Sequence, residues 1–242
     1  MGIANEMQGT GRLLVERNST TGDCLLLVKP IADYRSVVRI RDDFMSGGYT
    51  TGIVGELGWT LVNGTTTGVA AEANRYGVIQ RDTGASINTA ASMYPRGLAS
   101  VGTVDPRATS ETTWHVKLGQ AVGTFDFRVG LGNATNGDPP ADGVYFEVLA
   151  ADTNIFCVTR ATSSQTGSRT DSGVAASTNW VKLRIVSAAT SVMFYIDNVL
   201  VVTNTTNLTA VMVQPYLFLK NTEAVAKTVN IDLFDYIGQV TR

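Results

Sequence analysis

Apolar and polar residues alternate along much of the chain, most clearly where the apolar residues Phe125, Phe127 and Val129 enclose Asp126 and Arg128. This period of two is typical of a β-strand with one buried face and one solvated face. Similar short segments recur between Gly, Asn and Thr turns, and no helical period persists among them. The pattern predicts an all-β protein, built as an antiparallel β-sandwich of two packed sheets.

The clearest hairpin signal is the pair Asp197-Asn198, which lies between two apolar-rich segments. Asp and Asn tolerate the positive φ angles that a two-residue hairpin turn requires. In the segment before this turn, we expect Trp180 to lie among the inward apolar residues. Lys182 and Arg184 are expected to face water.

Residues 1–40 differ from the rest of the chain and contain two short apolar runs separated by a polar turn. The runs comprise Leu13, Leu14, Val15, Leu25, Leu26 and Leu27. They predict either a hairpin that completes the sandwich or an arm that adds strands to a neighbouring subunit, since unpaired strand edges accept further strands. The sandwich itself is predicted to span residues 41–242.

One part of the chain resembles the late strands of concanavalin A-like, laminin-G-like jelly rolls. It consists of Trp180 with the alternating residues after it, a short loop and the segment 194–201. Residues 42–44 and 231–237 are similar to the terminal strands that pair in these folds. The resemblance implies a concanavalin A-like jelly roll over residues 41–242.

Four further segments are similar to jelly-roll proteins of tailed bacteriophage particles, namely 55–59, 127–133, 138–147 and 179–184. This resemblance implies a structural protein of a virion, either a capsid decoration (cement) protein or a tail-associated protein. Its partners would be other virion proteins and further copies of itself, and it would assemble in the host cytoplasm. The alternative is a carbohydrate-binding module or host-receptor adhesin, whose ligand would be a glycan.

Size and charge narrow these function classes. The 242 residues suffice to bury a substantial core, and 19 Lys and Arg against 21 Asp and Glu give a net charge of −2. A nearly neutral chain has no general attraction to nucleic acid or anionic membranes. No apolar run approaches the ~20 residues of a membrane-spanning helix, and residues 1–8 lack a secretory signal pattern. We expect neither nucleic acid nor membrane as a partner.

Paired carboxylates would indicate an enzyme, because glucanases of this fold carry acids at alternate positions of one strand. Such residues share a face and flank the scissile bond. Here Glu147 has Tyr145 and Leu149 at those positions, and the three-residue spacing of Asp232 and Asp235 predicts opposite faces of a strand. The sequence therefore predicts a protein that is not an enzyme.

The single histidine and the two cysteines offer little chemistry. His115 would have to serve any nucleophilic mechanism, yet its place beside Trp114 on an alternating segment favours a hydrogen-bonded structural imidazole. Cys24 and Cys157 lie in apolar segments and are expected to be buried reduced thiols. Their spacing gives no zinc site, and we expect no cofactor.

Calcium is the best candidate metal. Asn136, Asp138 and Asp142 supply the oxygen ligands that calcium prefers. Pro139 and Pro140 also fix the backbone there, and Asp and Asn suit a simple turn. The turn is the favoured interpretation.

Glycan binding would need exposed aromatic side chains that stack on sugar rings. The candidates are Trp59, Tyr76, Tyr94 and Tyr145. The favoured alternative places Trp59, Trp114 and Trp180 in the sandwich interior, because aromatic residues dominate such cores. Arg160, Arg169 and Asp171 are expected to form cross-strand surface pairs rather than a ligand clamp.

Overall fold

The computed structural model describes residues 14–17, 24–27, 37–44, 53–67, 75, 77–95, 104–120, 123–133 and 139–239. The chain divides into two compact units. One is Met1–Val38 with Gln239–Arg242, and the other is Arg39–Gly238. None of the described residues belongs to a helix that could cross a membrane.

The first unit contains a two-stranded antiparallel ribbon. Strand β1 (Leu14–Arg17) pairs with β2 (Cys24–Leu27), and Leu14 lies opposite Leu27. The ribbon coincides with the two apolar runs of the sequence, of which Leu13 lies outside the described residues. The two runs thus pair with each other, and both alternatives, a hairpin that completes the sandwich and an assembly arm, stay predictions.

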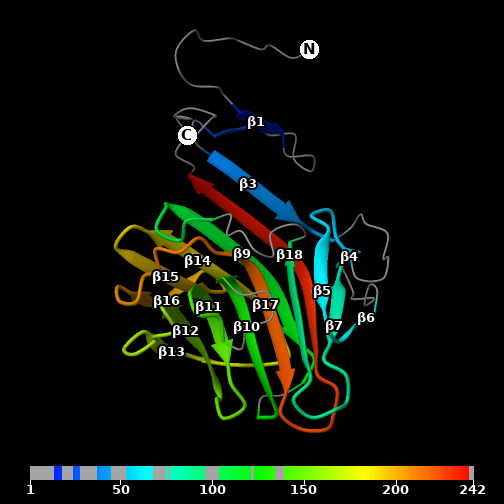
Figure 1. The fold of residues 1–242 in the computed structure, drawn as a ribbon. Coiled ribbons are helices and arrows are strands. Elements are labelled where there is room, and N and C mark those ends of the chain that lie inside the picture. The colour runs from blue at the N-terminus through cyan, green and yellow to red at the C-terminus, as the bar shows by residue number, and fades with distance from the viewer. Residues whose placement is uncertain are drawn as a thin grey trace. The chain divides into compact units, whose positions relative to one another are not determined.

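The second unit is an antiparallel β-sandwich (Figure 1). Sheet I comprises β4 (Ile53–Val54), β5 (Trp59–Val62), β8 (Ala90–Pro95), β10 (Phe125–Gly132), β11 (Gly143–Val148), β12 (Asn154–Arg160), β13 (Arg169–Ala175) and β17 (Gln214–Asn221). Sheet II comprises β3 (Val37–Asp42), β6 (Thr65–Thr67), β7 (Ile79–Asp82), β9 (Ser110–Leu118), β14 (Trp180–Ala188), β15 (Ser191–Ile196), β16 (Val199–Asn204) and β18 (Thr228–Gln239).

The strand order shows how the chain alternates between the sheets. Sheet I runs β13-β12-β11-β10-β17-β8-β5-β4, and sheet II runs β16-β15-β14-β9-β18-β7-β6 with β3 beside β18. Consecutive strands β10 to β13 therefore build one half of sheet I, and β14 to β16 build one edge of sheet II. This arrangement confirms the predicted all-β jelly-roll sandwich.

An aromatic cluster fills the core between the sheets. The Trp114 and Phe234 rings of sheet II lie 4.8 Å apart, and Trp59 of sheet I packs 5.6 Å from Trp114 and 5.2 Å from Phe234. All three side chains are fully buried. The Trp59 indole N–H donates to Asp42 at 2.9 Å, which satisfies its polar atom inside the core. The interior positions predicted for Trp59 and Trp114 are confirmed.

The hairpin between β15 and β16 also forms as predicted. Asp197 and Asn198 have φ angles of 48° and 70°, which is the backbone of a two-residue type I′ turn. The Asp197 carboxylate accepts a hydrogen bond from the backbone N–H of Lys182 at 2.9 Å, so the turn is fastened to β14.

The two sheets differ on their outer faces. Along β15 of sheet II, half-buried and buried residues alternate, as expected for a strand with one solvated face. In sheet I, every residue of β11 is buried, and β17 has a single half-buried position. The outer face of sheet I is therefore covered around these strands, and that of sheet II meets solvent.

Candidate functional site

Glu147 is the centre of a buried ion-pair network on the outer face of sheet I. It lies on β11 directly opposite Arg128 of β10. Its Oε1 accepts a hydrogen bond from Arg128 Nε at 2.8 Å, and its Oε2 accepts one from Arg169 Nε at 2.5 Å. Arg169 also pairs with Asp152. The side chain of Glu147 is 1% exposed and that of Arg128 4%, so each buried charge has an opposite partner.

Two phenylalanines support this network. The Arg169 guanidinium lies 3.7 Å from the ring centre of Phe156, and that of Arg128 lies 5.4 Å from that of Phe218. Stacking on aromatic faces stabilises a cation that has lost its water. Glu147 therefore holds arginines in place and has no oxygen left over for acid or base chemistry.

Arg160, Arg169 and Asp171 take partners other than one another: Arg160 Nη1 donates to Gln165 Oε1 at 2.9 Å, and Arg169 pairs with Glu147 and Asp152. Asp171 instead accepts hydrogen bonds from Asn154 Nδ2 and from the backbone N–H of Gly173. The Gly173 hydrogen bond, then that from Asn154, lowers the pKa of the Asp171 carboxyl. Arg169 pairs with Glu147 instead, because an opposite charge stabilises the buried Glu147 carboxylate more than the exposed Asp171 carboxylate.

The aromatic residues predicted to bind glycan are not on an open surface. Trp59 lies in the core, and Tyr94 and Tyr145 lie on the covered outer face of sheet I, with exposed fractions of 0%, 7% and 0%. Burial, with the nearby charge of Glu147, raises the pKa of Tyr145 to about 12. Tyr76 lies outside the described residues. The stacking role is therefore wrong for the three described residues, because their rings already pack within the protein.

The described part of the calcium candidate is a turn. Asp142 is buried, and its Oδ1 accepts hydrogen bonds from Thr162 N at 3.0 Å and from Thr209 Oγ1 at 2.8 Å. Asn136 and Asp138 lie outside the described residues. Among the residues that the structure describes, no three His, Cys, Asp or Glu side chains cluster closely enough to hold a metal. Asp142 therefore links the loops that contain Thr162 and Thr209.

Cys157 is a free, fully buried thiol. Burial, with the charge of Asp171, raises the pKa of this thiol far above its ordinary value, so it stays protonated and unreactive. The predicted buried reduced state is confirmed for Cys157. The side chain of Cys24 lies outside the described residues.

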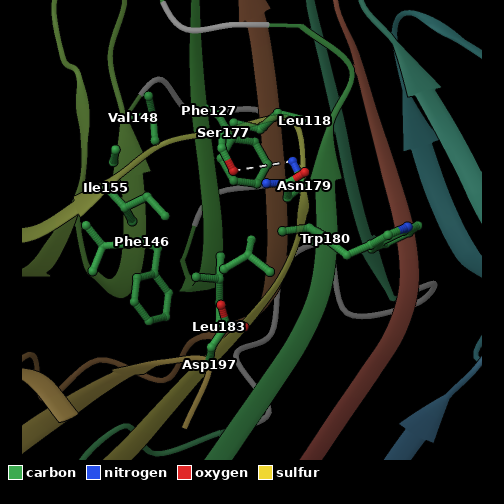
Figure 2. Close-up of a pocket in the computed structure, with 14 residues that line it drawn as sticks. Leu118, Phe127, Phe146, Val148, Ile155, Ser177, Asn179, Trp180, Leu183 and Asp197 are labelled. Carbon is green, nitrogen blue, oxygen red and sulfur yellow. Dashed lines mark hydrogen bonds between the residues drawn. The ribbon is translucent and has the colours of Figure 1, made fainter. Parts of the chain in front are cut away.

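Trp180 departs from its predicted interior position. It is half-buried, its indole projects away from the neighbouring pocket (Figure 2), and Arg75 stacks 4.3 Å from its ring centre. Arg75 also pairs with Asp232, whose Oδ2 lies 3.7 Å from His115 Nδ1. Trp180 is two residues from Lys182 and four from Arg184, so it shares their outward face.

Asp232 and Asp235 both reach this outer face, contrary to the prediction. Ile231 and Leu233 pair with consecutive residues of β9, which leaves Asp232 as the extra residue of a β-bulge. The bulge resets the alternation, so Asp235 also points outward and pairs with Arg39 at 2.8 Å. Each carboxylate is matched by its own arginine.

His115 lies in the same row of side chains. Burial, together with the positive charges of Arg75 and Lys182, lowers the pKa of its imidazole although Asp232 opposes this shift. His115 is thus neutral at pH 7 and fills the structural place that the sequence predicted. Arg184 completes the face, 3.1 Å from Glu111.

An apolar pocket of about 140 Å³ lies between the sheets beside the β13–β14 connection (Figure 2). Its floor is formed by the buried side chains Leu118, Phe127, Phe146, Val148, Ile155 and Leu183. Its rim contains the exposed residues Ser177, Asn179 and Asp197. The pocket therefore has an apolar floor and a polar mouth.

Strand β16 begins two residues after Asp197 of the rim and is an edge of sheet II. Val199 and Leu200 are 64% and 49% exposed, and the strand carries no charged residue. Its far end is fastened to sheet I, because Asn204 Nδ2 donates to Ser168 O at 3.0 Å. The first half of β16, Val199–Val201, is thus an exposed apolar edge. Strand order creates this edge, and the local sequence did not reveal it.

A comparison with protein families gives a match over residues 74–234 to the family described as SO2946-like, C-terminal domain. The chain belongs to this family. The match begins just before β7 and ends within β18, so the SO2946-like domain contains the Glu147 network, the pocket and β16. A search of curated proteins found no match.

Solved structures agree on the fold of this SO2946-like chain. The protein of unknown function SO2946 from Shewanella oneidensis MR-1 is 15% identical, with a TM-score of 0.59 over 86% of this chain and 89% of that one. Bacillus licheniformis β-glucanase is 15% identical, with a TM-score of 0.56 over 84% and 98%. The carbohydrate recognition domain of Emp46p is 12% identical, with a TM-score of 0.50 over 74% and 87%. At these identities the likeness shows the concanavalin A-like fold alone.

Proposed function

We propose that this chain is a non-enzymatic structural protein of a bacteriophage particle, a decoration or tail-associated subunit that joins neighbouring virion proteins. The observation that carries the proposal is the exposed, uncharged first half of β16. Its partners are other virion subunits and further copies of the chain, and assembly takes place in the host cytoplasm.

An edge strand of this kind is a surface for strand addition. Soluble proteins guard sheet edges with charged residues, prolines, bulges or covering loops, because unpaired backbone groups bind other strands. The segment Val199–Val201 has no charge and no proline, and two of its apolar side chains face solvent. A bulge lies at Val201, between the Phe194–Val202 and Tyr195–Leu200 pairs, so the segment from Val199 to Leu200 is the part that offers regular pairing.

The state of the outer faces supports a passive role. On sheet I, Glu147 is held by two arginines, and on sheet II, Asp232 and Asp235 are each held by one. Hydrolysis of a glycosidic bond requires two carboxyl groups that are free to act as acid and base. These three carboxylates are each paired with arginine, so they do not provide such a pair.

The N-terminal ribbon gives independent support. A two-stranded ribbon is marginally stable alone in water, so it gains stability by packing on further protein. Strands β1 and β2 form a sheet of their own. We infer that residues 1–40 act as an anchor on a neighbouring subunit.

Incorporation into particles tests the proposal. Val199→Lys places a charge on the exposed edge and is expected to reduce incorporation about tenfold, which corresponds to ~1.4 kcal/mol of lost association. Thr203→Lys, on the same strand near its fastened end, is the matched control and is expected to incorporate normally. Normal incorporation of Val199→Lys, with circular dichroism confirming its fold, would contradict the proposal.

Carbohydrate binding is the second candidate. It is favoured by Trp180, a half-buried residue on the open face of sheet II near His115 and Asp232, with Arg75 stacked on its ring. One protein of similar fold, the carbohydrate recognition domain of Emp46p, is compatible with this role.

A glycan array separates this candidate from the first. If the open face binds sugar, Trp180→Ala lowers affinity for a bound glycan about tenfold, or ~1.4 kcal/mol. Trp59→Phe leaves it unchanged, because the Trp59 indole is buried. An array without any bound glycan would remove this candidate.

A further inference from the structure

The carboxylate of Asp232 has two competing partners on the open face of sheet II. Its Oδ2 accepts a hydrogen bond from Arg75 Nη1, and His115 Nδ1 lies 3.7 Å from the same oxygen. The guanidinium of an arginine is always charged, whereas an imidazole gains its charge only as the pH falls. One oxygen is therefore shared between a permanent cation and a pH-dependent one.

Arg75 also covers the indole of Trp180. Its guanidinium lies 4.3 Å from the ring centre. The side chain of Arg75 is 30% exposed, so it can leave this position for water. Among the residues that the structure describes, the buried Trp180 Nε1 has no hydrogen-bond acceptor. An unsatisfied buried donor costs free energy, which favours a state in which the indole meets more water.

The charges around His115 come from several strands. Lys182 lies directly opposite His115 on β14, and Lys117 lies two residues further along β9 on the same face. Asp232 of β18 is the acid next to them. Other charged residues of this face form pairs of their own, namely Asp235 with Arg39 and Glu111 with Arg184. A protonated His115 therefore meets these two lysines and Arg75 as like charges and Asp232 as its opposite charge.

We propose that protonation of His115 transfers Asp232 from Arg75 to the imidazolium and thereby releases Arg75 from Trp180. The imidazolium takes its proton from solvent and has an N–H at both ring nitrogens, so Nδ1 donates to Asp232. The device goes beyond the proposed function, because it operates in the domain alone and needs no partner.

The two cations oppose each other reciprocally. Burial lowers the pKa of His115, Asp232 raises it, and the charges of Arg75 and Lys182 lower it further. Because Arg75 opposes the proton on His115, that proton weakens the hold on Arg75 by the same free energy. Acidification therefore uncovers the indole of Trp180.

The titration of His115 tests this competition. His115 is the only histidine of the chain, so its ring protons report the titration directly by NMR. Arg75→Gln removes the competing cation and is expected to raise the midpoint. Arg39→Gln removes the arginine paired with Asp235 of the same strand and is the matched control, for which we expect no change. A midpoint unaffected by Arg75→Gln would overturn the inference.

Quenching of tryptophan fluorescence by acrylamide tests the release of Arg75. Trp59 and Trp114 are fully buried, so a change with pH reports Trp180. In the full-length protein, the quenching constant is expected to rise about twofold as His115 takes up its proton. His115→Gln cannot gain this charge and is expected to keep the low value at every pH.

Two further variants complete the test. Arg75→Gln is expected to show the high quenching constant throughout, and Trp180→Phe is expected to show no rise. Constant quenching in the unaltered protein across the titration of His115 would overturn the inference. An equal rise in His115→Gln or in Trp180→Phe would overturn it as well, since the change would then come from elsewhere in the domain.

Discussion

At the scale of single residues, the buried charge of Glu147 is neutralised by its immediate neighbours. Glu147 is almost completely buried, yet both of its oxygens meet a guanidinium, and both arginines stack on phenylalanine rings. Such a pair is weak evidence for net stabilisation, but removal of one partner leaves an uncompensated buried charge. The network is therefore most sensitive at its shared carboxylate.

Glu147→Gln is expected to lower the free energy of unfolding by about 3 kcal/mol, because Arg128 would lose its buried counter-charge. Urea unfolding measures this change. Glu111→Gln removes a matched carboxylate from the half-exposed Arg184 pair and is expected to cost less than about 1 kcal/mol. Equal losses in the two variants would show that Glu147 is not a buried network partner.

His115 gives the molecule a pH dependence of known sign. Its pKa is lowered in the folded state, so the unfolded chain binds the proton more readily. The stability from neutral His115 is complete above the unfolded pKa of about 6.5 and is lost as the pH falls through the folded value.

Thermal unfolding at pH 7 and pH 5 tests this sign. The unaltered protein is expected to lose more stability between these two values than His115→Gln, which cannot gain the proton. Equal losses of stability in the two proteins would mean that burial and the neighbouring positive charges do not lower the pKa of His115.

At the scale of elements, the β15–β16 turn is the clearest case of local sequence control. Both turn residues have positive φ, so Asn198→Gly is expected to be neutral or stabilising. Asn198→Val forces a β-branched residue into the left-handed region and is expected to cost about 1–2 kcal/mol. Chemical denaturation of both variants measures the difference, and equal stability would argue against the type I′ turn.

This turn was predictable because its signal lies within four residues. The outward position of Asp232 was not, since it depends on a bulge that appears when β18 pairs with β9. Trp180 was misplaced for a different reason. Its size and apolar ring suggested the core, whereas its spacing from Lys182 already placed it on the outward face.

At the scale of the whole molecule, sequence patterning gave the fold class and most of the strands. It did not give the strand order, and the strand order decides which surfaces are free. Tyr94 and Tyr145 occupy outward positions of their strands, where the alternating pattern predicts exposure. They are buried because the outer face of sheet I is covered. The exposed half of β16 and the apolar pocket likewise arise from contacts between segments far apart in the chain.

The domain buries its aromatic cluster and the Glu147 network and leaves the uncharged segment Val199–Val201 at a sheet edge. Electron cryomicroscopy of the assembled particle that the proposed function predicts tests this account most directly. We expect density for the sandwich on the particle, with an added strand along Val199–Leu200. A particle without this domain, or one in which that edge faces solvent, would contradict the account.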